Sequence, residues 1–239
     1  MAGRLLVCDL DGTLIDEKGA VVPGVASALD RLAAEGVACM VCTGRPLADA
    51  RRLLAAAGLY AAILAVCHGA LVIDRRKGRY LRHVTVPGRL LPGLLDAARE
   101  GGLSTTVYLG ARVFSAHDPL PPRATRLIML GEEARVAAAL PALRELAGGA
   151  VLVDRPAADR IDVRHARATK DQALCLVAER LGVALADTVA VGDDVSDVAM
   201  LRSAGRAVVV GGRDSPIRDA GDVLVARAEL AAFLLSLAV

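Results

Sequence analysis

Short apolar runs alternate with helix-like segments through the first part of the chain. The runs at 4–8, 37–42 and 61–66 are typical of strands that are buried on both faces. Between them, the segments 23–36 and 46–57 have helical spacing, and each ends at or beside a glycine. This strand–helix–strand–helix–strand order predicts a parallel sheet that is covered by helices.

The same pattern returns near the C-terminus. We expect helices at 170–181 and 195–204, and strands at 188–191, 207–210 and 223–225. The two ends of the chain therefore predict one sheet that is built from both of them.

The middle of the chain has a different order of predicted helices and strands. We expect helices and strands in two helix-plus-strands units there: helices at 89–100 and 133–147, and strands at 104–109, 112–115, 125–130, 151–154 and 160–163. Pro87-Gly88 and the polar stretch 164–169 mark its two ends. The chain is therefore expected to have a core, residues 1–85 plus 164–239, and an inserted α+β domain, residues 86–163.

Composition agrees with a globular protein and gives no support for nucleic-acid binding. The chain is 54% hydrophobic and 23% charged, which is ample material for a core. Aromatic residues make up only 2%, too few for a base-stacking surface, and 29 Lys and Arg nearly balance 27 Asp and Glu. The short basic run at 75–79 is interpreted as a solvated turn around Gly78.

Neither a membrane span nor a disulfide framework is expected. Residues 55–73 contain no Asp, Glu, Lys or Arg, but Gly58 and His68-Gly69 interrupt this run. The five cysteines are an odd number, so they cannot all form disulfides within one chain. Asp9 interrupts the first apolar run too early for that run to be a signal peptide. We therefore expect a soluble cytoplasmic protein, as a monomer or a homodimer.

The strongest chemical signal follows the first predicted strand. Asp9 and Asp11 stand two residues apart, so both carboxylates are expected on one side of an extended chain. The carboxyl end of a strand in a parallel sheet is the usual place for a ligand. Two carboxylates so close together repel each other unless a cation lies between them, and oxygen ligands suit magnesium.

Three further clusters occupy similar positions. Thr43-Gly44-Arg45 follows the second strand, where a hydroxyl and backbone N–H groups can hold an anion. Lys170 begins a predicted helix and can pair with a phosphate or an aspartate. Asp193 and Asp197 follow a later strand, where Asp193 could complete a metal site with Asp9. Each cluster alone also fits ordinary helix capping or a solvated surface.

Taken together, the four clusters resemble the haloacid dehalogenase superfamily, in the order that this family uses. The insert lies between Thr43 and Lys170, which resembles the Cof-like branch with an α/β cap. The turn Cys67-His68-Gly69-Ala70 looks like the Asn-Gly-Ala turn of that branch. The resemblance implies an α/β fold with a Rossmann-like parallel-sheet core and an inserted α+β cap domain.

The resemblance also implies a magnesium-dependent phosphatase acting on a small phosphorylated metabolite. In this scheme Asp9 is the nucleophile that forms an aspartyl-phosphate, Asp11 is the general acid and base, and Lys170 balances charge. The implied magnesium ligands are Asp9, Asp11 through its backbone carbonyl, Asp193, and Asp197 through a water. The implied substrate- and phosphate-binding residues are Thr43, Gly44, Arg45, Ser196 and His68.

Three residues depart from the branch pattern. Ser196 and His68 each stand where Asn is usual, and Asp171 stands where Gly usually follows the lysine. Two other functions therefore stay open: a phosphotransferase or phosphomutase on the same core, and a weakened domain that binds a phosphometabolite. A receiver-type signalling domain is excluded, because it needs neither the large insert nor the second half of the core.

Overall fold

A computed structural model describes residues 4–16, 18–115 and 118–238 of the chain. The chain divides into two compact units, a core unit of residues 1–81 and 169–239 and an insert unit of residues 82–168. These divisions fall four and five residues from the predicted boundaries at 85/86 and 163/164.

The core unit is built on an eight-stranded sheet. Its strands are, in spatial order, β13 (Val223–Val225), β12 (Arg206–Val210), β11 (Thr188–Gly192), β1 (Leu5–Cys8), β2 (Ala38–Cys42), β3 (Ile63–Val66), β4 (Leu71–Asp74) and β5 (Arg79–His83). The pairs from β13 to β3 are parallel, and β3 and β4 pair antiparallel. Because β1 lies between β2 and β11, the two ends of the chain meet at the middle of the sheet.

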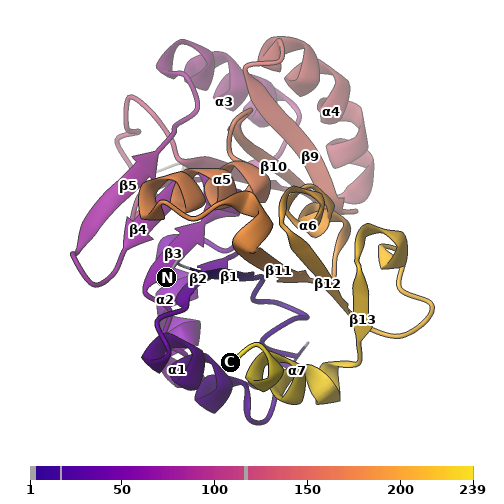
Figure 1. Cartoon of the computed structure of the whole chain (residues 1–239). Helices are drawn as coiled ribbons and strands as arrows, with labels where there is room; N and C mark the ends of the chain where they lie inside the picture. The colour runs from indigo at the N-terminus through magenta and orange to yellow at the C-terminus, as the bar shows by residue number, and fades with distance from the viewer. Residues whose placement is uncertain (1–3, 17, 116–117, 239) are drawn as a thin grey trace. The chain divides into compact units, whose positions relative to one another are not determined.

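Helices cover both faces of this sheet (Figure 1). On one face lie α1 (Val25–Ala34), α2 (Leu47–Ala56) and α7 (Leu230–Ser236), and on the other lie α5 (Lys170–Leu181) and α6 (Val198–Ser203). The buried residues of α1 are Val25, Ala28, Leu29 and Leu32, the spacing of one apolar stripe. Both faces of the central strands are therefore buried, which explains their continuous apolar runs.

The insert unit is a five-stranded antiparallel sheet with two helices. Its strands are, in spatial order, β7 (Arg112–Phe114), β6 (Ser104–Leu109), β8 (Arg126–Leu130), β10 (Arg160–His165) and β9 (Val151–Ala157). The helices α3 (Leu91–Glu100) and α4 (Glu133–Ala147) share one apolar core with the sheet. The predicted fold class, a Rossmann-like parallel-sheet core with an inserted α+β unit, is thus confirmed.

Short 3-10 helices complete the chain: η1 (Cys67–Gly69), η2 (Gly88–Leu90), η3 (Leu185–Asp187), η4 (Val195–Asp197), η5 (Arg218–Ala220) and η6 (Arg227–Glu229). The single helix expected at 195–204 is in fact η4 followed by α6. The sequence patterns did not predict β4 and β5, and Arg79 begins a strand although it was expected in a turn. In the described residues, no helix is long and apolar enough to span a membrane.

Candidate active site

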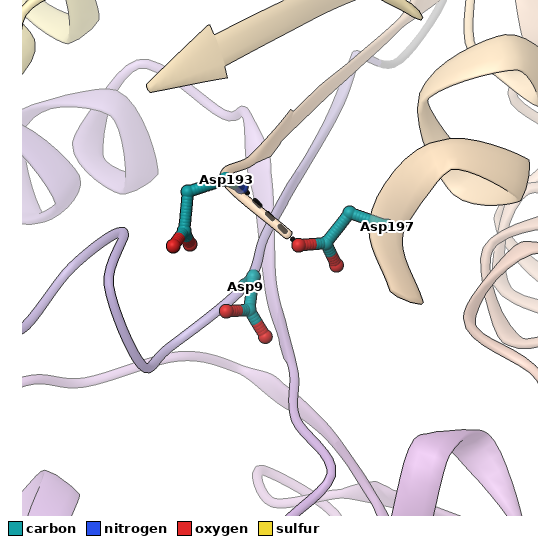
Figure 2. Close-up of side chains that lie close together, drawn as sticks. All are labelled: Asp9, Asp193 and Asp197. Carbon is teal, nitrogen blue, oxygen red and sulfur yellow. Dashed lines mark hydrogen bonds between the residues drawn. The ribbon is translucent and has the colours of Figure 1, made fainter. Parts of the chain in front are cut away.

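Three carboxylates meet at one edge of the core sheet. Asp9 follows β1, Asp193 follows β11, and Asp197 is the last residue of η4. One carboxylate oxygen from each lies within 4.8 Å of the others, and Figure 2 shows the three side chains gathered together. They meet because β1 and β11 are adjacent parallel strands, whose carboxyl ends lie side by side. Sequence reasoning predicted this convergence of Asp9 and Asp193.

One ammonium group joins the cluster. Lys170 is the first residue of α5, and its Nζ donates hydrogen bonds of 2.6 Å to Oδ1 of Asp9 and 2.6 Å to Oδ1 of Asp197. The exposed fractions of Asp9, Lys170 and Asp197 are 4%, 4% and 0%, so these charges interact away from bulk water. We call Asp9, Lys170, Asp193 and Asp197 the acidic cluster.

The acidic cluster holds more negative than positive groups, and the pKa values of its members are shifted. Burial raises the pKa of Asp9 to about 7, although Lys170 acts in the opposite direction. Burial also raises the pKa of Asp193 above its ordinary value. For Lys170, burial favours the neutral form, but the charges of Asp9 and Asp197 outweigh it and raise its pKa. Among the described residues the cluster holds three carboxylates and one ammonium group. The three carboxylates offer only oxygen ligands, which suit a hard divalent cation.

Neighbouring groups hold the carboxylates in place. Oδ2 of Asp197 accepts hydrogen bonds from the backbone N–H groups of Asp193, at 3.2 Å, and Asp194, at 3.1 Å. The buried hydroxyl of Thr13 donates to Oδ1 of Asp193 at 2.6 Å. Gly12 has φ +84°, and a Cβ there would lie 2.0 Å from Oδ2 of Asp193. A side chain at position 12 would therefore fill the space that the Asp193 carboxylate occupies.

Asp11 has a different partner from Asp9. Its carboxylate accepts hydrogen bonds from Arg45, from Nε at 2.9 Å and from Nη2 at 2.6 Å, and the Thr43 hydroxyl donates to its Oδ2 at 3.4 Å. Both side chains of this ion pair remain about 40% exposed. In the described part of the chain, the group of three carboxylates does not include that of Asp11. A role for Asp11 as a metal ligand through its backbone carbonyl stays a prediction.

The turn after β3 is joined to the loop after β2. The backbone N–H groups of Cys67 and His68 donate to the carbonyls of Arg45, at 2.9 Å, and Thr43, at 3.0 Å. Cys67 and His68 have φ of 50° and 56°, a left-handed conformation that is costly for residues with a side chain. A Cβ on Gly44 would lie 2.7 Å from Nε2 of His68, so the imidazole packs directly on that glycine.

The structure thus brings most predicted site residues to the same edge of the sheet. Ser196 lies in η4 and is exposed, and Asp171 is half-buried in the first turn of α5. Thr13 belongs to the motif that begins at Asp9, but sequence reasoning assigned it no role in the site. It also missed Arg227, whose Nε donates to the Gly12 carbonyl at 2.8 Å, and nothing in the sequence pointed to that contact.

Comparison with known proteins decides the family. The model of the haloacid dehalogenase-like hydrolases matches residues 6–134 and 122–229, which together span most of the chain. The chain belongs to the haloacid dehalogenase-like hydrolases. This confirms the family that the four motifs predicted, and the residues that form the acidic cluster come from those motifs.

Several relatives of this haloacid dehalogenase-like hydrolase are named phosphatases. Phosphatase YwpJ of Bacillus subtilis is 23% identical, over 92% of this chain and 94% of the relative. Pyridoxal phosphate phosphatase YbhA of Escherichia coli is 22% identical, over 94% of each chain. The crystal structure of a haloacid dehalogenase-like hydrolase from Bacteroides thetaiotaomicron superposes with a TM-score of 0.86 at 20% identity, over 98% of this chain and 99% of that one. The structural likeness extends over both units of the chain.

Proposed function

We propose that this haloacid dehalogenase-like hydrolase is a magnesium-dependent phosphatase that hydrolyses a small phosphorylated metabolite. The acidic cluster carries the proposal, because buried carboxylates in excess over a single ammonium group need a further cation. The names of relatives such as the pyridoxal phosphate phosphatase of E. coli give independent support for the reaction type. The two lines of support are separate, since one rests on geometry and the other on similarity.

The chain's own groups suggest which residues hold the ion. Asp9 and Asp193 are the proposed direct ligands, with the backbone carbonyl of Asp11, and Asp197 acts through a water or by holding Lys170. When bound, magnesium supplies positive charge that offsets the negative charge of a transferring phosphoryl group. Gly12 and Thr13 leave room for the Asp193 carboxylate and orient it.

The reaction that we propose has two displacement steps. A carboxylate oxygen of Asp9 forms a bond to phosphorus while the bond from phosphorus to the leaving oxygen breaks, and Asp11 gives a proton to that oxygen. In the second step Asp11 takes a proton from water, whose oxygen attacks phosphorus and releases inorganic phosphate and the Asp9 carboxylate. Lys170 contacts Asp9 in the structure and keeps its attacking carboxylate in position.

The contacts of Asp11 add one condition to this scheme. Arg45 donates hydrogen bonds to both oxygens of the Asp11 carboxylate, the group that has to exchange a proton with the substrate. Before Asp11 can act as a proton donor, its pairing with Arg45 has to loosen. A phosphate bound near Thr43 and Arg45 offers the guanidinium another anion, so substrate binding could free Asp11 for the first step. Gly44, His68 and Ser196 remain proposed contacts of the substrate.

We assign the insert unit a role as a cap that recognises the leaving group. Its position in the sequence, between the motif at Thr43 and the motif at Lys170, supports this assignment. The identity of the substrate then depends on the insert, while the chemistry depends on the core unit.

Hydrolysis of p-nitrophenyl phosphate tests the proposal. The wild-type chain should release nitrophenol with added magnesium and lose this activity with excess EDTA. Asp9→Asn should lower turnover by more than about 10⁴-fold, because it removes the nucleophile. Asp187→Asn, at an exposed aspartate of the core unit, is the matched control and should keep wild-type turnover. Full activity in Asp9→Asn would show that the scheme is wrong.

The same assay separates hydrolysis from phosphoryl transfer and then identifies the substrate. Free phosphate should equal released nitrophenol when an alcohol such as glycerol is present, since water is the proposed acceptor. A deficit of free phosphate would instead indicate a phosphotransferase. A panel of sugar phosphates, phosphoglycolate and cofactor phosphates, including pyridoxal 5′-phosphate, then ranks leaving groups by kcat/KM.

A further inference from the structure

Positive charge is concentrated in one part of the core unit, apart from the acidic cluster. Residues 47–81 contain six Lys and Arg and only two Asp, an excess of +4 in a chain whose net charge is +2. This segment comprises α2, β3, β4 and the first part of β5, and the hairpin of β4 and β5 forms one edge of the core sheet (Figure 1). The basic run at 75–79, first interpreted as a solvated turn, belongs to this hairpin.

The charged segment lines an open cleft. Its volume is about 430 Å³, within the range of small-molecule sites, and its lining residues are Arg51, Ile73, Arg75, Gly78 and Tyr80. Arg51 comes from α2, and the others come from the hairpin. Ile73 is only 2% exposed and gives the cleft an apolar portion, whereas the Tyr80 side chain is largely exposed. We call this feature the Arg51–Arg75 cleft.

One of its arginines is already held in place. The Arg75 guanidinium lies 4.9 Å from the centre of the Tyr60 ring, and its Nη1 donates to the Ala61 carbonyl at 3.2 Å. Two contacts of this kind reduce the rotamer entropy that an arginine loses when it binds an anion.

The nearby acids are engaged elsewhere. Asp49 pairs with Arg52 at 3.1 Å, and Asp74 accepts from the backbone N–H of Lys77 at 3.0 Å. Neither aspartate is among the described residues that line the cleft, so the lining presents two guanidinium groups without a neutralising carboxylate.

We propose that the Arg51–Arg75 cleft binds a small organic anion, with a phosphate or phosphonate group between the two arginines and a flat apolar group against Ile73 and Tyr80. Guanidinium groups suit this anion because their planar donors match its oxygens. The apolar part of the lining gives a reason for an organic anion to bind better than inorganic phosphate. The site shares no residue with the acidic cluster, so it is a second site.

Titration of the full-length protein with phenylphosphonate tests this site. Phenylphosphonate combines a dianion with a flat ring and has no P–O–C ester bond to hydrolyse. Calorimetry in EDTA should detect its saturable binding, and Arg51→Glu should weaken the affinity about tenfold or more, because a charge-assisted contact becomes repulsive. Arg202→Glu, at an exposed arginine of α6 outside the lining, is the control and should bind as wild type.

A second variant and two competitors complete the test. Arg75→Gln should also weaken phenylphosphonate binding, with unchanged p-nitrophenyl phosphate turnover as the sign of an intact fold. Inorganic phosphate should compete more weakly than phenylphosphonate. Equal phenylphosphonate affinities in wild type, Arg51→Glu and Arg75→Gln would overturn the proposal. So would binding of a DNA oligonucleotide at this patch without any binding of phenylphosphonate, which would indicate a polyanion surface.

Discussion

Both units of the chain bury charged side chains, but they do so with different charge balances. In the insert unit, Arg126 and Asp162 lie on neighbouring strands and are each 2% exposed. The Arg126 guanidinium donates through Nε to Oδ1 of Asp162 at 2.7 Å and also pairs through Nη2. Here one fully buried guanidinium group faces one fully buried carboxylate, and the more exposed Arg160 lies 3.8 Å from the same carboxylate. In the acidic cluster of the core unit, the ammonium group of Lys170 pairs with the carboxylates of Asp9 and Asp197, and a third carboxylate, that of Asp193, lies beside them.

This difference distinguishes a structural ion pair from a candidate ion site. A buried pair with good geometry compensates its own desolvation, so it needs no further charge. A buried cluster with excess negative charge is stable only when a cation enters or a proton binds. Burial is the main cause that raises the pKa of Asp9 to about 7, and the charge of Asp197 acts in the same direction. The same residue types thus serve different purposes, according to whether their charges balance.

The largest expected effect comes from removing the one ammonium group. Lys170→Met leaves the buried carboxylates of Asp9 and Asp197 without their partner, and we expect the metal-free protein to lose about 3–5 kcal/mol of stability. Urea unfolding in EDTA measures this loss, and added magnesium should recover part of it. Lys77→Met, at an exposed lysine of the hairpin, should change stability little. A similarly small change in Lys170→Met would mean that the acidic cluster is not electrostatically strained.

A smaller effect is expected from Thr13, which orients Asp193. Thr13→Val removes the 2.6 Å hydrogen bond to Oδ1 of Asp193, and we expect magnesium affinity to fall about 10- to 100-fold. Thr13→Ser keeps the hydroxyl and is the control. Calorimetric titration with magnesium compares the three proteins. If Thr13→Val bound magnesium as tightly as wild type, Asp193 would not need its orienting partner.

The smallest effect is expected from replacing the balanced pair as a whole. In Arg126→Met with Asp162→Leu both charges disappear together, so we expect stability to change by less than about 1 kcal/mol or to rise. The single variant Asp162→Leu leaves a buried guanidinium and should cost about 3–5 kcal/mol. Thermal unfolding of the two variants measures whether the double variant loses less stability than Asp162→Leu. Equal losses would contradict the view that charge balance distinguishes the two units.

Much of the core could be predicted from the sequence, because its signals are local. The apolar runs of β1, β2 and β3 and the helix at 170–181 needed only hydrophobic spacing and glycine positions. The hairpin of β4 and β5 was missed for a physical reason. Residues 71–74 continue an apolar run that could be assigned to the preceding strand, and the basic residues of 79–83 do not alternate as a half-buried strand would.

The sequence predicted which residues belong to the candidate site but not which of them contact one another. Strand ends placed Asp9, Asp11, Thr43 and Asp193 at one edge of the sheet, since parallel strands bring these ends together. The sequence could not show that Asp11 turns toward Arg45 while Asp9 turns toward Lys170. Such choices depend on side-chain rotamers and long-range packing, which no local pattern determines.

The central claim is that the excess negative charge of the acidic cluster is there to bind a single divalent cation. Calorimetric titration of the metal-free protein with magnesium tests this claim most directly, with Asp193→Asn as the variant and Asp187→Asn as the control. The account predicts one magnesium per chain in wild type and in Asp187→Asn, and loss of that binding in Asp193→Asn. Unchanged binding in Asp193→Asn, or no binding in wild type, would contradict it.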